Sequence, residues 1–226
     1  MDLRIIRAFI QLSLALLFAA GGVVFPQEEA KFTSYYYDKC SAYKILPDTD
    51  GEIVFLGDSI TDRCEWAELF ANSGIIRRGI SGDITEGVLH RLSEISGRKP
   101  SKIFIMIGIN DLRRNYDIDS VIVKNYSQIL SSLQKETKET KIYIQSVLPV
   151  NNKVKDTKTT NKNVYDLNSK LQSLAFVNGI KYIDLFNRFI DEEGNLHKDL
   201  TSDGLHINGN GYLIWRDVIS SEVNND

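Results

Sequence analysis

Short apolar runs alternate with amphipathic segments along most of the chain, and this alternation constrains the fold more than any other feature. Five runs are short, rich in β-branched residues and bounded by glycine or polar residues, as is typical of buried strands. These runs are residues 53–56, 75–79, 102–107, 141–147 and 180–185. Helical patterns follow them at residues 61–71, 84–95, 120–135, 164–177 and 208–220. Since crossovers between parallel strands are right-handed, this order predicts an α/β fold, a three-layer α/β/α sandwich around a five-stranded parallel sheet.

The first residues do not fit this pattern and have the layout of a targeting segment. Arg4 and Arg7 provide a positive start, an almost uninterrupted apolar run covers residues 8–20, and small residues follow. This layout predicts a cleaved signal peptide and an exported protein, periplasmic or secreted, with no stable membrane association afterwards. The alternative is an uncleaved anchor, because residues 8–25 are almost long enough to span a bilayer. The predicted division is a signal peptide at 1–22, a lead-in segment at 23–50 and the folded domain at 51–226.

Composition excludes several classes of protein. The chain has 226 residues, of which 42% are hydrophobic and 25% charged, as expected for one folded domain. The net charge is -3 and no basic stripe is present, so we expect no nucleic-acid partner. Cys40 and Cys64 are too few for a disulfide scaffold or a zinc site, and they either form one bridge or stay thiols. The three histidines show no ligand spacing, so we expect neither a metal nor a cofactor.

Two polar or aromatic segments allow more than one interpretation. A helix is predicted at residues 35–46, and its Tyr35-Tyr36-Tyr37 run either packs against the domain or forms a carbohydrate-stacking platform. Residues 151–163 are polar and lack periodicity, and they follow the fourth strand. They would therefore overhang the carboxyl edge of the sheet, as a mobile lid, as part of a substrate rim or as a plain solvated loop.

Chemically versatile residues gather where the predicted strands end. Gly-Asp-Ser follows the first strand, Gly-Ile-Ser-Gly-Asp the second and Gly-Ile-Asn-Asp the third, and Asp-Gly-Leu-His comes after the fifth. Each motif alone is compatible with an ordinary turn or helix cap. In a parallel sheet, however, all of them lie at one edge, where such folds bind ligands. A hydroxyl, an imidazole, a carboxylate and amide donors at one place are the groups that acyl transfer requires.

The role of each candidate follows from its chemistry. Ser59 is the candidate nucleophile at a strand-to-helix turn, and it needs an adjacent base. His206 can accept the hydroxyl proton, and Asp203 can hold the other ring nitrogen. The Gly82 N–H, the Asn110 side-chain amide and the Ser59 N–H are the candidate oxyanion donors.

The two other histidines, His90 in an amphipathic segment and His197 in a Gly-Asn loop, are better interpreted as surface or packing residues.

These four motifs, in this order, resemble the SGNH (GDSL) hydrolase superfamily over roughly residues 52–219, with Ile60 in place of the usual Leu. The stretches RGISGD and DGLHIN are similar to the branch of platelet-activating-factor acetylhydrolase-like proteins and bacterial carbohydrate O-acetylesterases. One departure is Arg77, where this branch usually has Asn. The resemblance implies a flavodoxin-like sheet in the order 2-1-3-4-5. It also implies a triad of Ser59, His206 and Asp203, with Gly82 and Asn110 as oxyanion donors.

The resulting hypothesis is an exported serine esterase that uses an acyl-enzyme intermediate and no metal or cofactor. The resemblance implies a short acyl group, acetyl above all, on a small-molecule or glycan ester. A lysophospholipase or thioesterase is the alternative among enzymes. A non-catalytic flavin- or glycan-binding module is the alternative outside them, although no phosphate-binding fingerprint is present. The sugar and the oligomeric state stay open.

Overall fold

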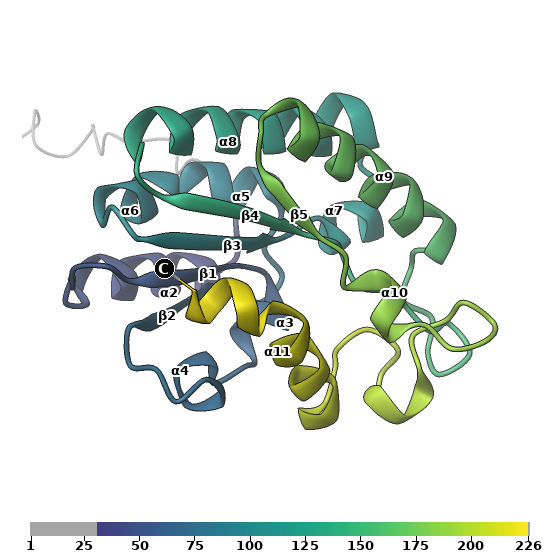
Figure 1. Ribbon diagram of the computed structural model, residues 1–226. Coiled ribbons are helices and arrows are strands. Elements are labelled where there is room, and N and C mark those ends of the chain that lie inside the picture. The colour runs from purple at the N-terminus through teal and green to yellow at the C-terminus, as the bar shows by residue number, and fades with distance from the viewer. Residues whose placement is uncertain (1–30, 226) are drawn as a thin grey trace, which may run out of the picture. The chain divides into compact units, whose positions relative to one another are not determined.

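Five parallel strands form the sheet in the order β2-β1-β3-β4-β5 within the described part of the chain (Figure 1). The computed structural model describes residues 31–225. The strands are β1 (Ile53–Gly57), β2 (Ile75–Gly79), β3 (Lys102–Met106), β4 (Lys141–Gln145) and β5 (Lys181–Ile183). The predicted α/β class and the strand order implied by the resemblance are both confirmed.

The register brings the carboxyl ends of three neighbouring strands to one level. Gly57 of β1 pairs with Gly79 of β2 and with Met106 of β3. A Cβ atom at Gly57 would clash with Thr61 Oγ1, and one at Gly79 would clash with the backbone of Asp62. The two glycines therefore let the turn after β1 press directly onto the end of the sheet.

Helices cover both faces of the sheet (Figure 1). On one face, Trp66 stacks on Phe55 at 4.0 Å and meets Trp215 edge-on at 4.9 Å, so α4 and α11 pack together against β1. On the other face α8 buries Ile129 and Leu133 completely. The first face carries α3 (Ser59–Asp62), α4 (Trp66–Leu69) and α11 (Gly209–Asn224). The second carries α5 (Thr85–His90), α6 (Leu92–Gly97), η1 (Ile118–Val123), α8 (Lys124–Glu136) and α9 (Asn161–Val177).

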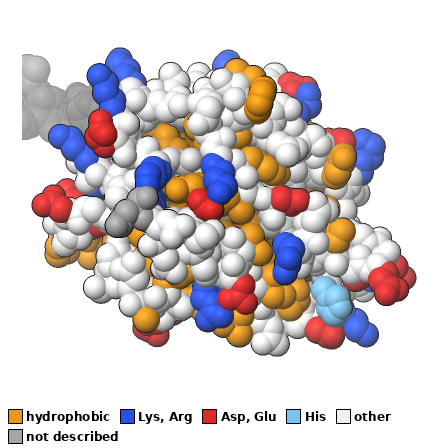
Figure 2. Space-filling view, viewed as in Figure 1, with side chains coloured by type: hydrophobic (Ala, Val, Ile, Leu, Met, Phe, Trp, Pro, Cys, Tyr) orange, Lys and Arg blue, Asp and Glu red, His pale blue; other side chains and the backbone are white. Residues whose placement is uncertain are grey.

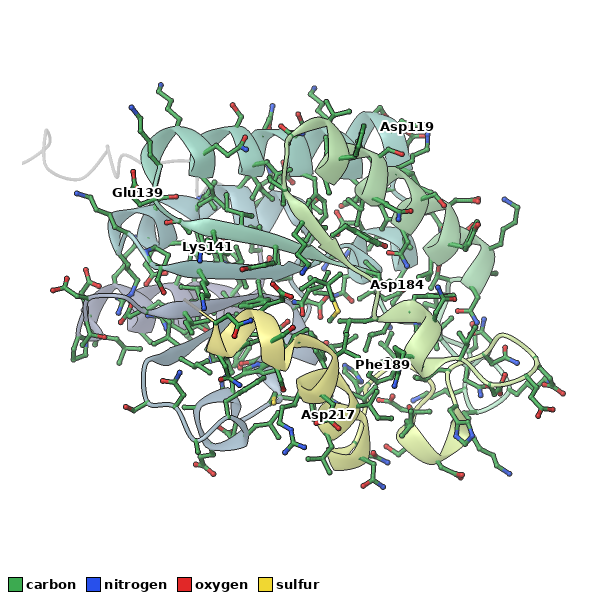
Figure 3. All side chains as sticks on the ribbon, in the orientation of Figure 1. Asp119, Glu139, Lys141, Asp184, Phe189 and Asp217 are labelled. Atoms are coloured by element: carbon green, nitrogen blue, oxygen red, sulfur yellow. The ribbon has the colours of Figure 1, made fainter. Side chains whose placement is uncertain are left out.

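Short elements gather beyond the carboxyl ends of the strands. These are α7 (Ile109–Arg113), α10 (Phe186–Phe189) and η2 (Lys198–Leu200). In Figure 3, Lys141 marks the amino end of β4 and Asp184 follows the carboxyl end of β5, which gives the direction of all five strands. Phe189, also labelled there, is completely buried and anchors α10. On the face seen in Figure 2, positive and negative side chains are interspersed.

Two predicted helices are each divided into two short ones. The helix predicted over residues 61–71 is divided into α3 and α4. The chain turns between them, and there the Trp66 indole N–H donates to the Thr61 carbonyl at 2.9 Å, in place of a helical backbone donor. The prediction over residues 84–95 becomes α5 and α6, which are separated at Arg91 (φ −107°). The Arg91 guanidinium reaches inward to the Gly57 carbonyl, a tertiary contact that sequence periodicity does not reveal.

The lead-in segment contains the expected helix, α2 (Ser34–Ile45), within one residue of the predicted bounds. From Phe32 onward the chain forms one compact unit that includes α2. The predicted signal peptide lies outside the described residues, and the boundary at residue 50 stays a prediction. No helix between residues 31 and 225 is both long and apolar enough to cross a membrane.

Both cysteines are free thiols, so the disulfide alternative for Cys40 and Cys64 is wrong.

Candidate active site

Ser59 begins α3, directly after β1. Asp58 caps this helix, because its Oδ1 accepts the Ile60 N–H at 2.9 Å. The Tyr212 hydroxyl of α11 donates to the Ile60 carbonyl at 2.7 Å and holds the turn from the other side. Ser59 itself is buried except for 7% of its surface. The serine hydroxyl therefore stands on a short, rigid turn at the carboxyl edge of the sheet.

The structure brings the three predicted triad residues into one hydrogen-bonded line. Ser59 Oγ lies 2.9 Å from His206 Nε2, although the two residues are 147 positions apart in the chain. His206 Nδ1 lies 2.6 Å from Asp203 Oδ2. Asp203 Oδ1 also accepts the backbone N–H of Leu205 and of His206, at 3.0 and 2.8 Å. The carboxylate is thus fixed by its own loop and in turn fixes the ring.

The loop that carries the histidine depends on Gly204. Its φ of +76° lies in the left-handed region, and a Cβ atom there would clash with the Asn151 carbonyl. The Asn151 N–H donates to the Gly204 carbonyl at 2.8 Å. The Thr201 hydroxyl oxygen accepts the Gly204 N–H at 2.9 Å. The loop's own Thr201 and the distant segment at Asn151 therefore set the position of His206.

Electrostatics select one tautomer of the His206 ring. Burial alone would raise the pKa of Asp203, but hydrogen bonds from the His206 ring and from backbone N–H groups outweigh it and lower the pKa to about 2. Burial lowers the pKa of His206, while Asp203 acts in the opposite direction. Near neutral pH an ionised Asp203 then accepts a hydrogen bond from Nδ1–H, which keeps this proton on Nδ1 and leaves Nε2 unprotonated, able to accept the Ser59 hydroxyl proton.

Asn110, in the first turn of α7, is held by contacts at both ends of its amide. Its Nδ2 donates to the Asp83 carbonyl at 3.0 Å, and its Oδ1 accepts from Arg113 Nη1 at 2.9 Å. A guanidinium can only donate, so Arg113 fixes which end of the amide is oxygen. One Nδ2 proton is used by Asp83, and the other is available to a ligand.

Gly82 supplies the second candidate donor from the turn after β2. Its φ is +82°, and a Cβ atom there would meet nothing within 4 Å. Glycine is therefore needed here for its backbone conformation, not to avoid a protein contact. Among residues 31–225, neither the Gly82 N–H nor the Ser59 N–H donates to a protein acceptor.

The sequence model of the GDSL-like Lipase/Acylhydrolase family matches residues 55–214. The chain belongs to the GDSL-like lipase/acylhydrolase family. The predicted superfamily is thereby confirmed, and the protein is a carboxylic-ester hydrolase.

Relatives of this GDSL acylhydrolase include acetylhydrolases and acetyl xylan esterases. The platelet-activating factor acetylhydrolase IB subunit alpha2 of Rattus norvegicus is 26% identical over 171 residues, covering 73% of this chain and 72% of the relative. A structure assigned to a platelet activating factor from Streptococcus pneumoniae has a TM-score of 0.78 at 24% identity, and covers 96% of this chain and 99% of that one. An acetyl xylan esterase, AlAXEase, has a TM-score of 0.65 at 22% identity, covering 76% and 99%. These structural likenesses show the shared fold.

Two aspartates of the family motifs support the loops of the GDSL site. Arg91 holds Asp83 through Nε at 3.0 Å and Nη2 at 2.9 Å, and Asp83 accepts the Ile84 N–H. Asp111 accepts both the N–H and the hydroxyl of Thr85, the latter at 2.6 Å, and burial raises its pKa to about 6. Both aspartates belong to the sequence motifs, but the sequence does not reveal these roles, because their partners are distant in the chain or become visible only in three dimensions.

The polar segment at residues 151–163 is firmly attached beside the site. Asn151 and Thr157 are buried, and the Asn151 amide donates to the Leu196 carbonyl at 2.7 Å. Arg113 Nε donates to the Thr157 carbonyl at 2.9 Å, so one guanidinium connects this segment to Asn110. Asn152 and Asn161 of this segment also donate to backbone carbonyls, whereas Lys153, Lys155 and Lys158 are exposed, so the segment is anchored at particular residues and solvated between them.

The remaining histidines lie elsewhere, as predicted. The His90 ring packs 5.4 Å from the Phe32 ring, and exposed His197 caps η2. Within the described residues, no group of His, Cys, Asp and Glu side chains is placed to hold a metal ion.

Proposed function

We propose that this acylhydrolase is an exported serine esterase that removes short acyl groups, acetyl in particular, from carbohydrate esters. The observation that carries the proposal is the hydrogen-bonded line from Asp203 through His206 to Ser59, at 2.6 and 2.9 Å. Export rests on the signal-peptide pattern of residues 1–22.

Acylation is the first half of the proposed reaction. Ser59 Oγ attacks the ester carbonyl carbon while His206 Nε2 accepts the hydroxyl proton. The charge that forms on the ring is stabilised by Asp203. As the tetrahedral intermediate collapses, the C–O bond to the alcohol breaks, and the alcohol takes the proton from Nε2. An acyl group remains on Ser59.

Deacylation repeats these steps with water as the nucleophile. Water gives a proton to His206 Nε2 and attacks the acyl carbon. As the second tetrahedral intermediate collapses, the bond between the acyl carbon and Ser59 Oγ breaks, Nε2 returns the proton to Oγ, and the acid is released. In both halves the carbonyl oxygen becomes negative. The N–H groups of Ser59 and Gly82 and the Asn110 amide would donate to it.

The proposed acyl group follows from the names of the relatives. Both the acetylhydrolase subunits and the acetyl xylan esterase are named for acetyl esters. The carbohydrate acceptor rests on the xylan esterase and on the similarity of RGISGD and DGLHIN to carbohydrate O-acetylesterases.

The experiment measures acyl-chain preference and acetate release. We expect kcat/KM for p-nitrophenyl acetate to exceed that for the octanoate by at least about tenfold, since each methylene that does not fit costs about 1–3 kcal/mol. Acetylated xylan should release acetate with the native chain and not with Ser59→Ala. A preference for octanoate or for a thioester would instead support the lysophospholipase or thioesterase alternative.

A further inference from the structure

Two tyrosine hydroxyls of α2 hold the two ends of the segment that contains Gly82. Tyr43 donates to the carbonyl of Gly79, the last residue of β2, at 2.6 Å. Tyr36 donates to the carbonyl of Gly87 in α5 at 2.7 Å. The segment between these two carbonyls, residues 80–86, contains the turn that presents the Gly82 N–H and the start of α5. In Figure 1, α2 lies near the edge of the sheet that β2 forms.

A third contact from the same helix is made with Asp62 of α3, which also binds Ser81 of that segment. Asp62, the last residue of α3, accepts the Tyr35 hydroxyl and the Ser81 hydroxyl at its Oδ2, both at 2.9 Å. Lys39 of α2 lies 3.2 Å from Asp62 Oδ1. Burial would raise the pKa of Asp62, but these partners outweigh it and hold the pKa below its usual range. An ionised carboxylate thus joins α2 to the helix that starts with Ser59 and to the residue before Gly82.

Tyr36 and Tyr43 are buried, and their hydroxyls form hydrogen bonds inside the protein rather than with solvent. Tyr36 and Tyr43 are seven residues apart, which puts them on one face of the helix, and they are only 2% and 5% exposed. β2 is an edge strand, so Gly79 lacks a neighbouring strand on its outer side. A buried carbonyl that loses its donor is costly, so the Gly79 carbonyl depends on Tyr43.

α2 lies outside the part of the chain that the family model matches. The family model matches residues 55–214, so α2 lies outside it, yet α2 belongs to the same compact unit as the sheet. The tyrosine run that suggested either packing or a sugar platform therefore has a specific set of partners. Those partners are the two segments that carry candidate oxyanion donors, Gly82 and Ser59.

We propose that α2 is a positioning element of the oxyanion hole, with Tyr36 and Tyr43 holding the Gly82 turn in its reactive geometry. This inference rests on the proposed function, since it requires Gly82 to donate to the oxyanion. A misplacement of about 1 Å at such a site can cost on the order of 10²-fold in rate, even when the substituted residue never touches substrate.

The test compares hydroxyl deletions that keep the aromatic rings in place. In the full chain, Tyr36→Phe, Tyr43→Phe and the double variant are measured with p-nitrophenyl acetate. Tyr37→Phe, on the same helix but more exposed, is the matched control. For the double variant we expect kcat per folded molecule to fall by about 10- to 100-fold with KM changed less than about twofold. The control should equal the native enzyme, and the pH profile should keep its shape because His206 is untouched.

Two results would overturn the inference. One is a double variant with kcat within twofold of native, and the other is a loss of activity that only follows the unfolded fraction measured by circular dichroism. Asn110→Ala is measured in parallel. If Asn110→Ala is fully active, the proposed oxyanion hole itself is wrong. If Asn110→Ala is impaired while the double tyrosine variant is not, only the role of α2 is wrong.

Discussion

Replacing Asn110 by Asp alters one polar atom in the candidate oxyanion hole and almost nothing in its size. The Nδ2 group that donates to the Asp83 carbonyl at 3.0 Å becomes an oxygen facing an oxygen. The other end keeps its contact, because Arg113 still finds an acceptor at the Oδ1 position. The substitution therefore removes a donor and adds negative charge where the oxyanion is proposed to form.

The expected magnitude has two parts. Loss of an oxyanion donor lowers kcat by about 10²–10³, or about 2.7–4 kcal/mol, with a much smaller effect on KM. Loss of the hydrogen bond to the buried Asp83 carbonyl costs about 1–3 kcal/mol of stability, since Asn110 is only 4% exposed. For a domain of this size that corresponds to a drop of roughly 2–12 °C in Tm. Asn110→Ala should show a similar stability loss and an equal or smaller loss of kcat.

The assay measures kcat, KM and Tm for both variants, with kcat expressed per folded molecule. Asn115→Asp is the matched control, because Asn115 is exposed just beyond the end of α7 and undergoes the same chemical change. The reasoning is refuted if Asn110→Asp retains near-native kcat, since Asp can support the same turn. It is equally refuted if both variants lose activity only in proportion to unfolding.

Three further predictions concern the triad and its loop. A fluorophosphonate should label Ser59 with one equivalent per chain, and peptide mapping to another residue would contradict the nucleophile assignment. Esterase activity should be unchanged by EDTA. It should fall on acidification only below the ordinary histidine pKa of 6.5, because burial lowers the pKa of His206 and its ring therefore stays neutral at lower pH. In the same assay His197→Ala should match the native chain, and a loss equal to that of His206→Ala would be inconsistent with this choice of base. Gly204→Ala should lower both Tm and kcat, because it combines a φ of +76° with a clash against the Asn151 carbonyl, and unchanged Tm would show that the loop can relax.

The sheet was predictable from sequence because burial on both faces demands continuous apolar runs. Residues 102–107 are the clearest case, and β3 is Lys102–Met106. β5 is shorter than predicted, Lys181–Ile183 against residues 180–185, because it pairs only with β4 at the edge. Parallel topology also explains why motifs far apart in the chain meet at one edge, so the sequence alone predicts that Ser59 and His206 lie close together.

The supporting contacts could not be predicted, because they join polar side chains to backbone carbonyls distant in sequence. Tyr43 and its acceptor Gly79 are 36 residues apart, and Asn151 and its acceptor Leu196 are 45 apart. Every residue has a backbone carbonyl, so the sequence does not show which carbonyl will act as an acceptor. A tyrosine run or an Asn- and Thr-rich stretch therefore has the same sequence pattern whether its side chains contact solvent or bind distant carbonyls. Residue type identified the chemistry, but only the structure identified which polar residues hold the loops.

Asn110 shows why the candidate catalytic residues and the polar residues that hold the loops depend on one another in this enzyme. The amide that is proposed to donate to the oxyanion also donates to the Asp83 carbonyl. The Asp83 carboxylate accepts from Arg91, and Arg91 also donates to the Gly57 carbonyl at the end of β1. A change anywhere along this chain of contacts shifts a candidate donor relative to Ser59. Stability and rate should therefore fall together for variants of these residues. In contrast, the surface control Asn115→Asp should change neither.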